Sequence, residues 1–78
     1  MTDLAHVVFS LHALDRMVER SIRVDEVRRA MNQDGPTSLD LDGNHRYDAA
    51  IDGRRLRVVT AADNPLFVIT VYVVSGPR

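Results

Sequence analysis

Residues 66–74 read Leu-Phe-Val-Ile-Thr-Val-Tyr-Val-Val, a run without a single charge. β-branched and aromatic residues dominate it, which predicts a β-strand. The run is far shorter than the ~20 apolar residues that cross a bilayer as a helix. An exposed edge strand normally carries charges or proline that hinder aggregation. We therefore expect this strand to have a neighbour at each of its edges.

Turn signals upstream of this strand divide the C-terminal half into short segments. Asp42-Gly43 and Asp52-Gly53 predict tight hairpin turns, and Asp63-Asn64-Pro65 predicts a looser one. The segments between them predict antiparallel strands near residues 37–41, 45–51, 55–61 and 66–74, joined as a meander. The third strand then lies at one edge of the last. The other edge is expected to pair with a short apolar strand near residues 5–9, or with a second copy in a homodimer.

Apolar residues at helical spacing precede these strands in the sequence. Ser10 can cap a helix over residues 10–20, with a stripe of Leu11, Leu14, Met17 and Val18. A second helix is expected over residues 24–33, ending by Gly35. The sequence thus predicts one α+β domain over residues 1–78, with an N-terminal short strand and two helices packed on a four-stranded antiparallel meander sheet. We expect the following side chains to be largely buried: Leu11, Leu14, Met17, Ile22, Val27, Met31, Val58, Phe67, Ile69 and Val71.

Composition narrows the classes of function. All ten basic residues are arginine, and eleven acidic residues bring the net charge to −1. This balance argues against a generic nucleic-acid binder, so any RNA contact would be local. A GC-rich genome would also explain the preference for arginine. The absence of cysteine excludes disulfides and thiolate zinc sites and predicts a reducing, cytoplasmic setting, and acidic Asp3 is atypical of a signal peptide.

One flank of the first helix carries residues suited to phosphate chemistry. His12, Arg16 and Arg20 are four apart and therefore share a side of the helix. Imidazole groups exchange protons near neutral pH, and paired guanidiniums can hold a phosphate. The alternative is a solvated face with local ion pairs such as Arg16 with Glu19.

Strand alternation suggests a second group of candidates. It separates Arg46 from Tyr47 on opposite faces of one strand, and it places Thr70 and Tyr72 on one face of the last strand. We expect the apolar face with Phe67, Ile69, Val71 and Val73 to lie under the helices. Thr70 and Tyr72 would then look toward a polar site, with Tyr47 as a further substrate-binding candidate. A tyrosine held by one hydrogen bond in the core is the commoner use of such residues.

The sequence gives little support for a bound metal ion or a nucleotide cofactor. The three histidines, at positions 6, 12 and 45, do not have the spacing of a metal site. The four glycines lie at expected turns or in the tail, so there is no phosphate-binding glycine loop. We expect neither a metal nor a nucleotide cofactor.

Residues 10–22 read Ser-Leu-His-Ala-Leu-Asp-Arg-Met-Val-Glu-Arg-Ser-Ile. This segment resembles the opening signature of a small bacterial domain family of unassigned function, with the pattern hydroxyl-x-His-Ala-x-x-Arg-Met-x-x-Arg-Gly-Ile. Residues 43–47, 56–60 and 68–72 are similar to later strand motifs of the same family. The family is grouped with the barnase, EndoU, colicin and RelE-like superfamily of metal-independent ribonucleases and toxins.

The resemblance implies helices packed on a four-stranded antiparallel sheet and RNA cleavage by attack of the 2′-hydroxyl on phosphorus. His12 would then transfer a proton while Arg16, Arg20 and Arg46 stabilise the phosphate charge. RNA and a cognate antitoxin or immunity protein are the implied partners. A non-catalytic protein- or RNA-binding module on the same scaffold is the alternative, favoured if the arginines are each paired with a carboxylate.

Two positions depart from the family pattern. Ser21 replaces the usual glycine after the second arginine, and Arg23 replaces the usual serine cap of the second helix. Serine is a poorer left-handed helix stop, and arginine cannot cap by accepting a hydrogen bond. The turn between the helices is therefore expected to be rebuilt.

Overall fold

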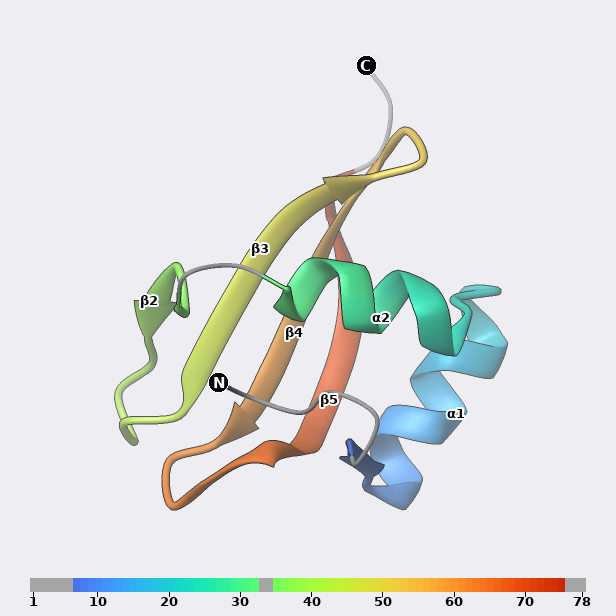
Figure 1. Ribbon diagram of the computed structural model, residues 1–78. Coiled ribbons are helices and arrows are strands. Elements are labelled where there is room, and N and C mark those ends of the chain that lie inside the picture. Colours follow the sequence, from blue (N-terminus) through green and yellow to red (C-terminus); the bar gives the residue numbers. More distant parts are fainter. Residues whose placement is uncertain (1–6, 33–34, 76–78) are drawn as a thin grey trace.

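The computed structural model describes residues 7–32 and 35–75 (Figure 1). The elements follow in the order β1 (Val8–Phe9), α1 (Leu11–Glu19), α2 (Val24–Met31), β2 (Ser38–Leu39), β3 (His45–Ile51), β4 (Arg54–Ala61) and β5 (Asn64–Ser75). The predicted α+β class and order of elements are confirmed. Residues 5–6 of the predicted first strand and residue 33 of the predicted second helix lie outside the described residues. No helix in the described part of the chain is long and apolar enough to cross a membrane.

The strands form one sheet in the order β1-β5-β4-β3-β2. Neighbours from β2 to β5 pair antiparallel, as the predicted meander requires. β1 adds a short parallel pair at the other edge of β5, with Val8 opposite Phe67 and Phe9 opposite Val68. The charge-free strand thus has β4 on one side and the N-terminal strand on the other, as predicted.

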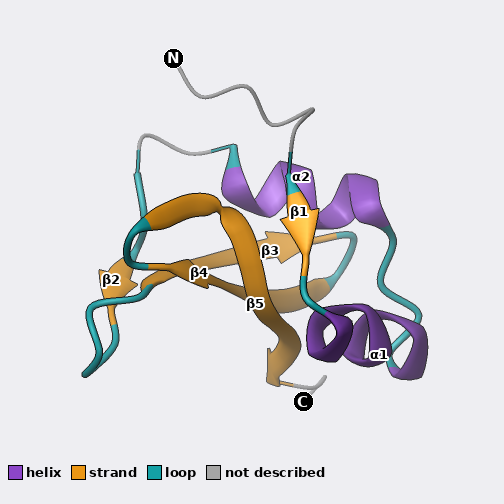
Figure 2. Cartoon of the chain, turned by 90° about the horizontal axis from the view of Figure 1, so that it is seen from below, coloured by secondary structure: helices purple, strands orange, loops and turns teal. Residues whose placement is uncertain are grey.

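The helices occupy different parts of this sheet (Figure 2). α2 packs across β3 and β4, whereas α1 packs beside β5 and β1. Within residues 7–32 and 35–75, no helix covers the face of β3 and β4 that lies opposite α2. We call that face, together with the residues of β5 that continue it, the open face.

Local hydrogen bonds explain where α1 begins and ends. The Oγ atom of Ser10 accepts from the backbone N–H of Ala13 (3.0 Å), which confirms the predicted N-cap. At the other end Ser21 adopts φ 54°, and the N–H of Ile22 donates to the carbonyl of Met17 (2.8 Å). This is the left-handed stop that glycine usually makes. At the end of α1 the expectation of a rebuilt turn is therefore wrong, because Ser21 adopts the strained conformation itself.

The start of α2 is capped in an unexpected way. Arg23 occupies the N-cap, and its backbone N–H donates to Oε1 of Glu26 (2.8 Å). A guanidinium cannot accept the reciprocal bond, so only the glutamate half of a capping box exists. Glu26 is 4% exposed, so the half of the capping box that exists is made by a buried carboxylate.

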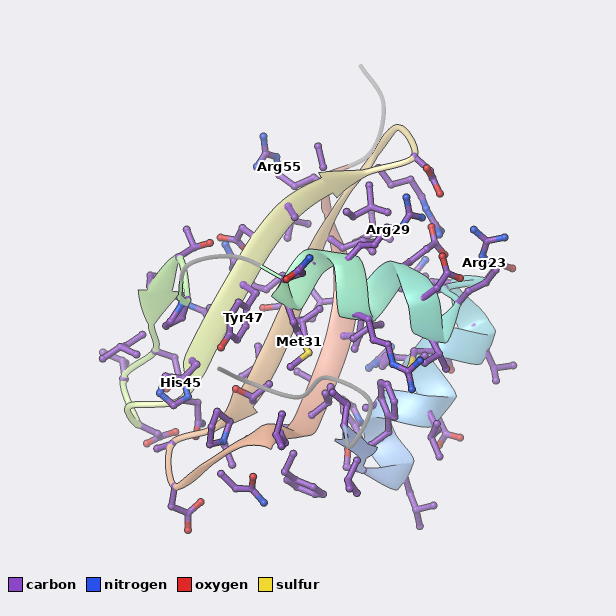
Figure 3. All side chains as sticks on the ribbon, in the orientation of Figure 1. Arg23, Arg29, Met31, His45, Tyr47 and Arg55 are labelled. Atoms are coloured by element: carbon purple, nitrogen blue, oxygen red, sulfur yellow. The ribbon has the colours of Figure 1, made fainter. Side chains whose placement is uncertain are left out.

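The core lies between the helices and the sheet, where Met31 of α2 and Tyr47 of β3 meet (Figure 3). The predicted burial of Met17, Ile22, Val27, Met31, Val58 and Val71 is confirmed. For Leu11 and Leu14 the prediction is wrong, since these side chains are 81% and 41% exposed. α1 turns Ala13 and Met17 inward instead, and the small alanine allows close approach to β5. The leucine stripe of the sequence is a second apolar face.

A bulge in β5 explains two further errors. Val59 lies opposite Thr70 and Thr60 opposite Val68, so Ile69 is an extra residue. An extra residue reverses the alternation of side chains. Phe67 and Ile69, predicted to be largely buried, are therefore only partly buried, while Val68 takes a core position. The carbonyl of Ile69 accepts from Oγ of Ser10 (2.7 Å), which ties the bulge to the start of α1.

The strand lengths also differ from expectation. β2 is confined to Ser38–Leu39 because Asp40 turns the chain, accepting from the backbone N–H groups of Asp42 (2.9 Å) and Asn44 (2.8 Å). β5 begins at Asn64, so residues 62–63 form a tight turn in place of the looser one predicted. The Asp52-Gly53 turn is confirmed, with φ 50° and 85°.

Candidate nucleic-acid interface

The open face is built from alternate residues of three neighbouring strands. In one row Arg46 of β3 lies opposite Val59 of β4, which lies opposite Thr70 of β5. The next row, two residues along each strand, consists of Asp48, Arg57 and Tyr72. Arg55 of β4 shares this face by alternation. The structure therefore brings Arg46, Thr70 and Tyr72 onto one surface, as strand alternation suggested.

Arg57 lies at the centre of this surface and was not among the sequence candidates. Its Nε and Nη2 atoms donate to the two carboxylate oxygens of Asp48 at 2.7 and 3.1 Å. Its Cζ atom lies 5.9 Å from the centre of the Tyr72 ring. The hydrogen bonds from Arg57, together with the charges of Arg46 and Arg55, hold the pKa of Asp48 below its usual value despite partial burial. Asp48 is thus an anion that fixes Arg57 over the tyrosine.

Arg46 is positioned by neutral groups. Its Nε atom donates to Oγ of Ser38 (3.0 Å) and its Nη2 atom to the carbonyl of Leu39 (3.2 Å), both on β2. Neither partner carries charge. The guanidinium is therefore held in place at the β2 side of the open face with its positive charge retained.

Tyr47 lies on the other side of the sheet. It is buried in the core with Val58 and Met31, and burial raises the pKa of its hydroxyl. Its neighbours on β3, Arg46 and Asp48, face the opposite way. Tyr47 is therefore separated from the other substrate-binding candidates by the thickness of the sheet.

His12, Arg16 and Arg20 lie on one flank of α1, as their spacing predicts. Nη1 of Arg16 donates to Oε1 of Glu19 (3.1 Å), so the local ion pair expected as the alternative is present. His12 and Arg20 are exposed, and within the described residues no ion pair involves either side chain. This flank therefore offers two exposed polar groups and one paired arginine.

The two groups of candidates lie on neighbouring elements, α1 and the sheet strand β5. Leu14 and Val18, on the opposite flank of α1, line a groove shared with Val24 at the start of α2. At about 100° per residue, the flank with His12 and Arg16 must then point away from α2. The open face is likewise turned away from α2. α1 adjoins β5, so Thr70 and Tyr72 are the nearest open-face residues to this flank.

The candidates are spread over a track and do not meet at one point. β4 lies between β3 and β5, so the Cα atoms of Arg46 and Thr70 are about 10 Å apart, twice the spacing of neighbouring strands. This track comprises His12 on α1, Tyr72 on β5, Arg57 on β4 and Arg46 on β3. We call these residues, with Arg16 and Arg20, the basic track.

Charge is distributed unevenly over the fold. The open face carries Arg46, Arg55 and Arg57 against one carboxylate, Asp48, although the chain as a whole has a net charge of −1. A positive, partly aromatic surface suits an anionic polymer with exposed bases. In the described part of the chain, no group of three or more acidic or histidine side chains is arranged to hold a metal ion.

The fold and this surface together define a small α+β domain in which the sheet face left open by the described helices is basic. The chain belongs to the family described as "Domain of unknown function (DUF4258)", which matches residues 9–73. The match confirms the resemblance to a small domain family without an assigned activity. Comparison with curated proteins and with solved structures yields no match.

Proposed function

We propose that this domain binds single-stranded RNA along the basic track and cleaves it without a metal ion. The observation that carries the proposal is the group of arginines and Tyr72 on the open face of the sheet, with α1 and its His12 flank packed beside β5. The resemblance to the barnase, EndoU, colicin and RelE-like superfamily supports the same chemistry. The absence of cysteine in the sequence is consistent with a cytoplasmic setting.

The track suits a strand better than a single phosphate. Arginines lie on β3 and β4, and Tyr72 on the neighbouring strand β5 offers a ring on which a base can stack. Arg57 is already held against that ring, so a base would stack beside a fixed guanidinium. Arg46 and Arg20, whose side chains form no ion pair within the described residues, would contact phosphates.

In the proposed reaction the 2′-hydroxyl oxygen attacks the adjacent phosphorus while the bond from phosphorus to the 5′-oxygen breaks. The products are a 2′,3′-cyclic phosphate and a 5′-hydroxyl, so one proton leaves the nucleophile and one reaches the leaving oxygen. His12 carries out one of these transfers. Arginines of the track stabilise the additional negative charge of the transition state.

A non-catalytic RNA-binding module is the second candidate. It is favoured by the pairing of Arg16 with Glu19 and of Arg57 with Asp48, since paired guanidiniums are less available to a reacting phosphate. Both candidates require RNA binding on the same track. They differ only in whether His12 reaches the reacting atoms.

Two oligonucleotides distinguish a ribonuclease from a non-catalytic RNA-binding module. A fluorescent single-stranded RNA and the same oligonucleotide with 2′-deoxy sugars are incubated with the protein in EDTA. We expect both to bind and only the RNA to be cut. His12→Ala is expected to lower the cleavage rate by about 10²-fold or more with RNA affinity within a few-fold of wild type.

The control is Arg28→Ala, which removes an exposed arginine from α2, away from the track. RNA binding without cleavage by the wild-type protein would establish the second candidate. If the wild type binds RNA no better than a triple variant with Arg16, Arg20 and Arg46 changed to alanine, both candidates fail.

A further inference from the structure

α1 carries an apolar surface that the core does not use. Leu11, Leu14 and Val18 recur at positions i, i+3 and i+7 and are 81%, 41% and 81% exposed. We call these three residues the apolar stripe. Val24, at the start of α2, is 39% exposed, and with Leu14 and Val18 it lines a groove between the two helices. Isolated apolar side chains are common on protein surfaces, but a continuous stripe at helical spacing is typical of an interaction site.

Acidic side chains border the stripe on its side away from the groove. At about 100° per residue, the order around α1 from the groove outward is Leu14, Val18, Leu11, Asp15 and Glu19. Asp15 is exposed, and no ion pair within residues 7–32 and 35–75 involves it. Glu19 is already paired with Arg16 at 3.1 Å. Asp15 therefore supplies the negative charge on this side of the stripe.

Arginines border the groove on its α2 side. Arg23 lines the groove, and Figure 3 shows it at the end of α2 nearest α1. Arg28 follows Val24 by four residues, so it lies on the same side of α2, one turn farther along. Nε of Arg23 lies 3.2 Å from a carboxylate oxygen of Asp25, whereas no ion pair in the described part of the chain involves Arg28, which is exposed. Arg28 therefore supplies the positive charge on this side.

These charges make the surface complementary to itself in one of the two symmetric arrangements of a pair. A two-fold axis parallel to α1 brings the stripes of two copies together and turns the Asp15 flank of each copy toward the groove and Arg28 of the other. A two-fold axis perpendicular to both helices would instead place Asp15 against Asp15 and the two Arg28 sides against each other. Opposite charges thus meet twice in the parallel pair, and like charges meet twice in the antiparallel pair.

The parallel pair also leaves room for both domains. Ala13 and Met17, which face the core, lie roughly a third of a turn around α1 from the stripe. The two-fold rotation therefore places the two sheets on opposite sides of the α1 pair, so neither sheet stands between the helices. The flank of α1 with His12 and Arg16 points away from the stripe, and the pair does not cover it.

We propose that two copies of the chain associate through this surface as a parallel two-fold dimer. The stripe of each α1 packs along the other stripe and beside the other groove, and Asp15 of each copy faces Arg28 of the other. Only four apolar side chains from each copy enter the interface. We therefore expect weak association, with a dissociation constant of about 1–100 µM. The proposal does not depend on RNA binding or cleavage.

Analytical ultracentrifugation over about 1–500 µM protein tests for the dimer, at low salt because the charge pairs are exposed. We expect the wild type to change from monomer to dimer across this range. Val18→Asp, at an 81% exposed position, is expected to weaken association by about tenfold or more. Circular dichroism checks that each variant is folded. A wild type that is monomeric at all concentrations, or a dimer that Val18→Asp leaves intact, would overturn the proposal.

Two charge reversals test the pairing of Asp15 with Arg28. Asp15→Arg and Arg28→Asp are each expected to weaken self-association by about tenfold, because like charges then meet twice. An equimolar mixture of the two variants restores opposite charges at both contacts, so its association is expected to lie within about threefold of wild type. Arg55→Asp, on the open face, makes the same change in net charge as Arg28→Asp and is the control with unchanged association. Single variants that associate like wild type would contradict the pairing.

A single introduced cysteine reports the direction of the two helices, since the chain has no cysteine of its own. In the parallel pair Leu11 lies beside its own equivalent, whereas in an antiparallel pair the two Leu11 residues lie at opposite ends of the interface. Leu11→Cys is therefore expected to form disulfide-linked dimers under mild oxidation, and Arg55→Cys, also at an exposed position, is not. A wild-type dimer without cross-linking of Leu11→Cys would overturn the parallel arrangement.

Discussion

Nη2 of Arg54, at the start of β4, lies 3.2 and 3.1 Å from the two carboxylate oxygens of Glu26, in the first turn of α2. The same guanidinium donates to the backbone carbonyls of Arg20 (2.6 Å) and Ser21 (3.2 Å), where α1 ends. One side chain thus joins the sheet, the end of α1 and the start of α2. It holds the turn between the helices, on which the placement of the His12 flank and of the groove between α1 and α2 depends.

Removing Arg54 is expected to destabilise the whole domain. In Arg54→Ala the carboxylate of Glu26, 4% exposed, would lose both hydrogen bonds from Nη2 of Arg54 and keep only the more distant guanidinium of Arg23, with Nε 3.9 Å from Oε1, as an ionic partner. We expect a loss of about 2–4 kcal/mol in the free energy of unfolding, measured by urea denaturation. Arg55→Ala, one residue along on the open face, is the matched control and is expected to change stability by less than about 0.5 kcal/mol. Similar losses of stability in both variants would show that the contacts of Arg54 with Glu26 and with the end of α1 do not stabilise the domain.

The stability of the domain is expected to fall in acid. The backbone N–H of Arg23, aided by the guanidinium of Arg54, lowers the pKa of Glu26 from its ordinary value of 4.5. The folded protein therefore binds this proton less readily than the unfolded chain, so the stabilisation is complete above the ordinary value and is lost as the pH falls below it. Urea midpoints measured from about pH 6 to pH 3 would show this decline.

The variant Glu26→Gln distinguishes the contribution of Glu26 to the loss of stability in acid from the contributions of other carboxylates. The variant is expected to be less stable than wild type at pH 7 and to lose less stability on acidification, because the amide does not titrate. Some decline remains, since the pKa of Asp48 is also lowered, chiefly by Arg57. Parallel stability curves for wild type and Glu26→Gln would show that Glu26 does not contribute.

Replacing Ser21 with glycine is expected to stabilise the protein. Ser21 adopts φ 54°, a conformation that costs a residue with a Cβ atom roughly 1–2 kcal/mol, whereas glycine adds entropy to the unfolded chain. The net gain is expected to be about 0.5–1 kcal/mol in thermal or urea unfolding. Ser21→Ala removes the hydroxyl and keeps the Cβ atom, so a comparable gain in that variant would refute the backbone explanation.

Packing on the two faces of α1 can be compared directly. Met17→Ala is expected to cost about 2–5 kcal/mol because the side chain is buried in the core, while Leu14→Ala is expected to cost less than about 1 kcal/mol because the side chain is 41% exposed. Equal costs would mean that the leucine stripe contributes to the core of the isolated domain.

Salt dependence reports on contacts with phosphate. If Arg46 contacts an RNA phosphate, Arg46→Ala weakens RNA binding. It also reduces the slope of log affinity against log salt concentration by about 1, the contribution of one phosphate contact. Arg28→Ala is expected to leave the slope unchanged. An unchanged slope in Arg46→Ala would show that Arg46 does not contact an RNA phosphate.

Local patterns were enough to predict much of the fold. The N-cap at Ser10 and the turn at Asp52-Gly53 depend on residues close in sequence, and both form as predicted. The lack of charge in residues 66–74 predicted a neighbour at each edge of the last strand, and β1 and β4 are those neighbours. Alternation likewise placed Arg46, Thr70 and Tyr72 on a common face.

Tertiary structure decided which of several compatible patterns is used. α1 is apolar on two faces, and only contact with β5 selects Ala13 and Met17 for the core and leaves Leu11 exposed. The bulge at Ile69 cannot be anticipated from alternation, because it arises in the pairing of β5 with β4.

Long-range ion pairs could not be predicted from the sequence for the same reason. Arg54 and Glu26, 28 residues apart, and Arg57 and Asp48, on paired strands, each resemble ordinary surface charges in the sequence. Periodicity describes how a segment relates to itself, whereas burial and ion pairing depend on which other segment packs against it.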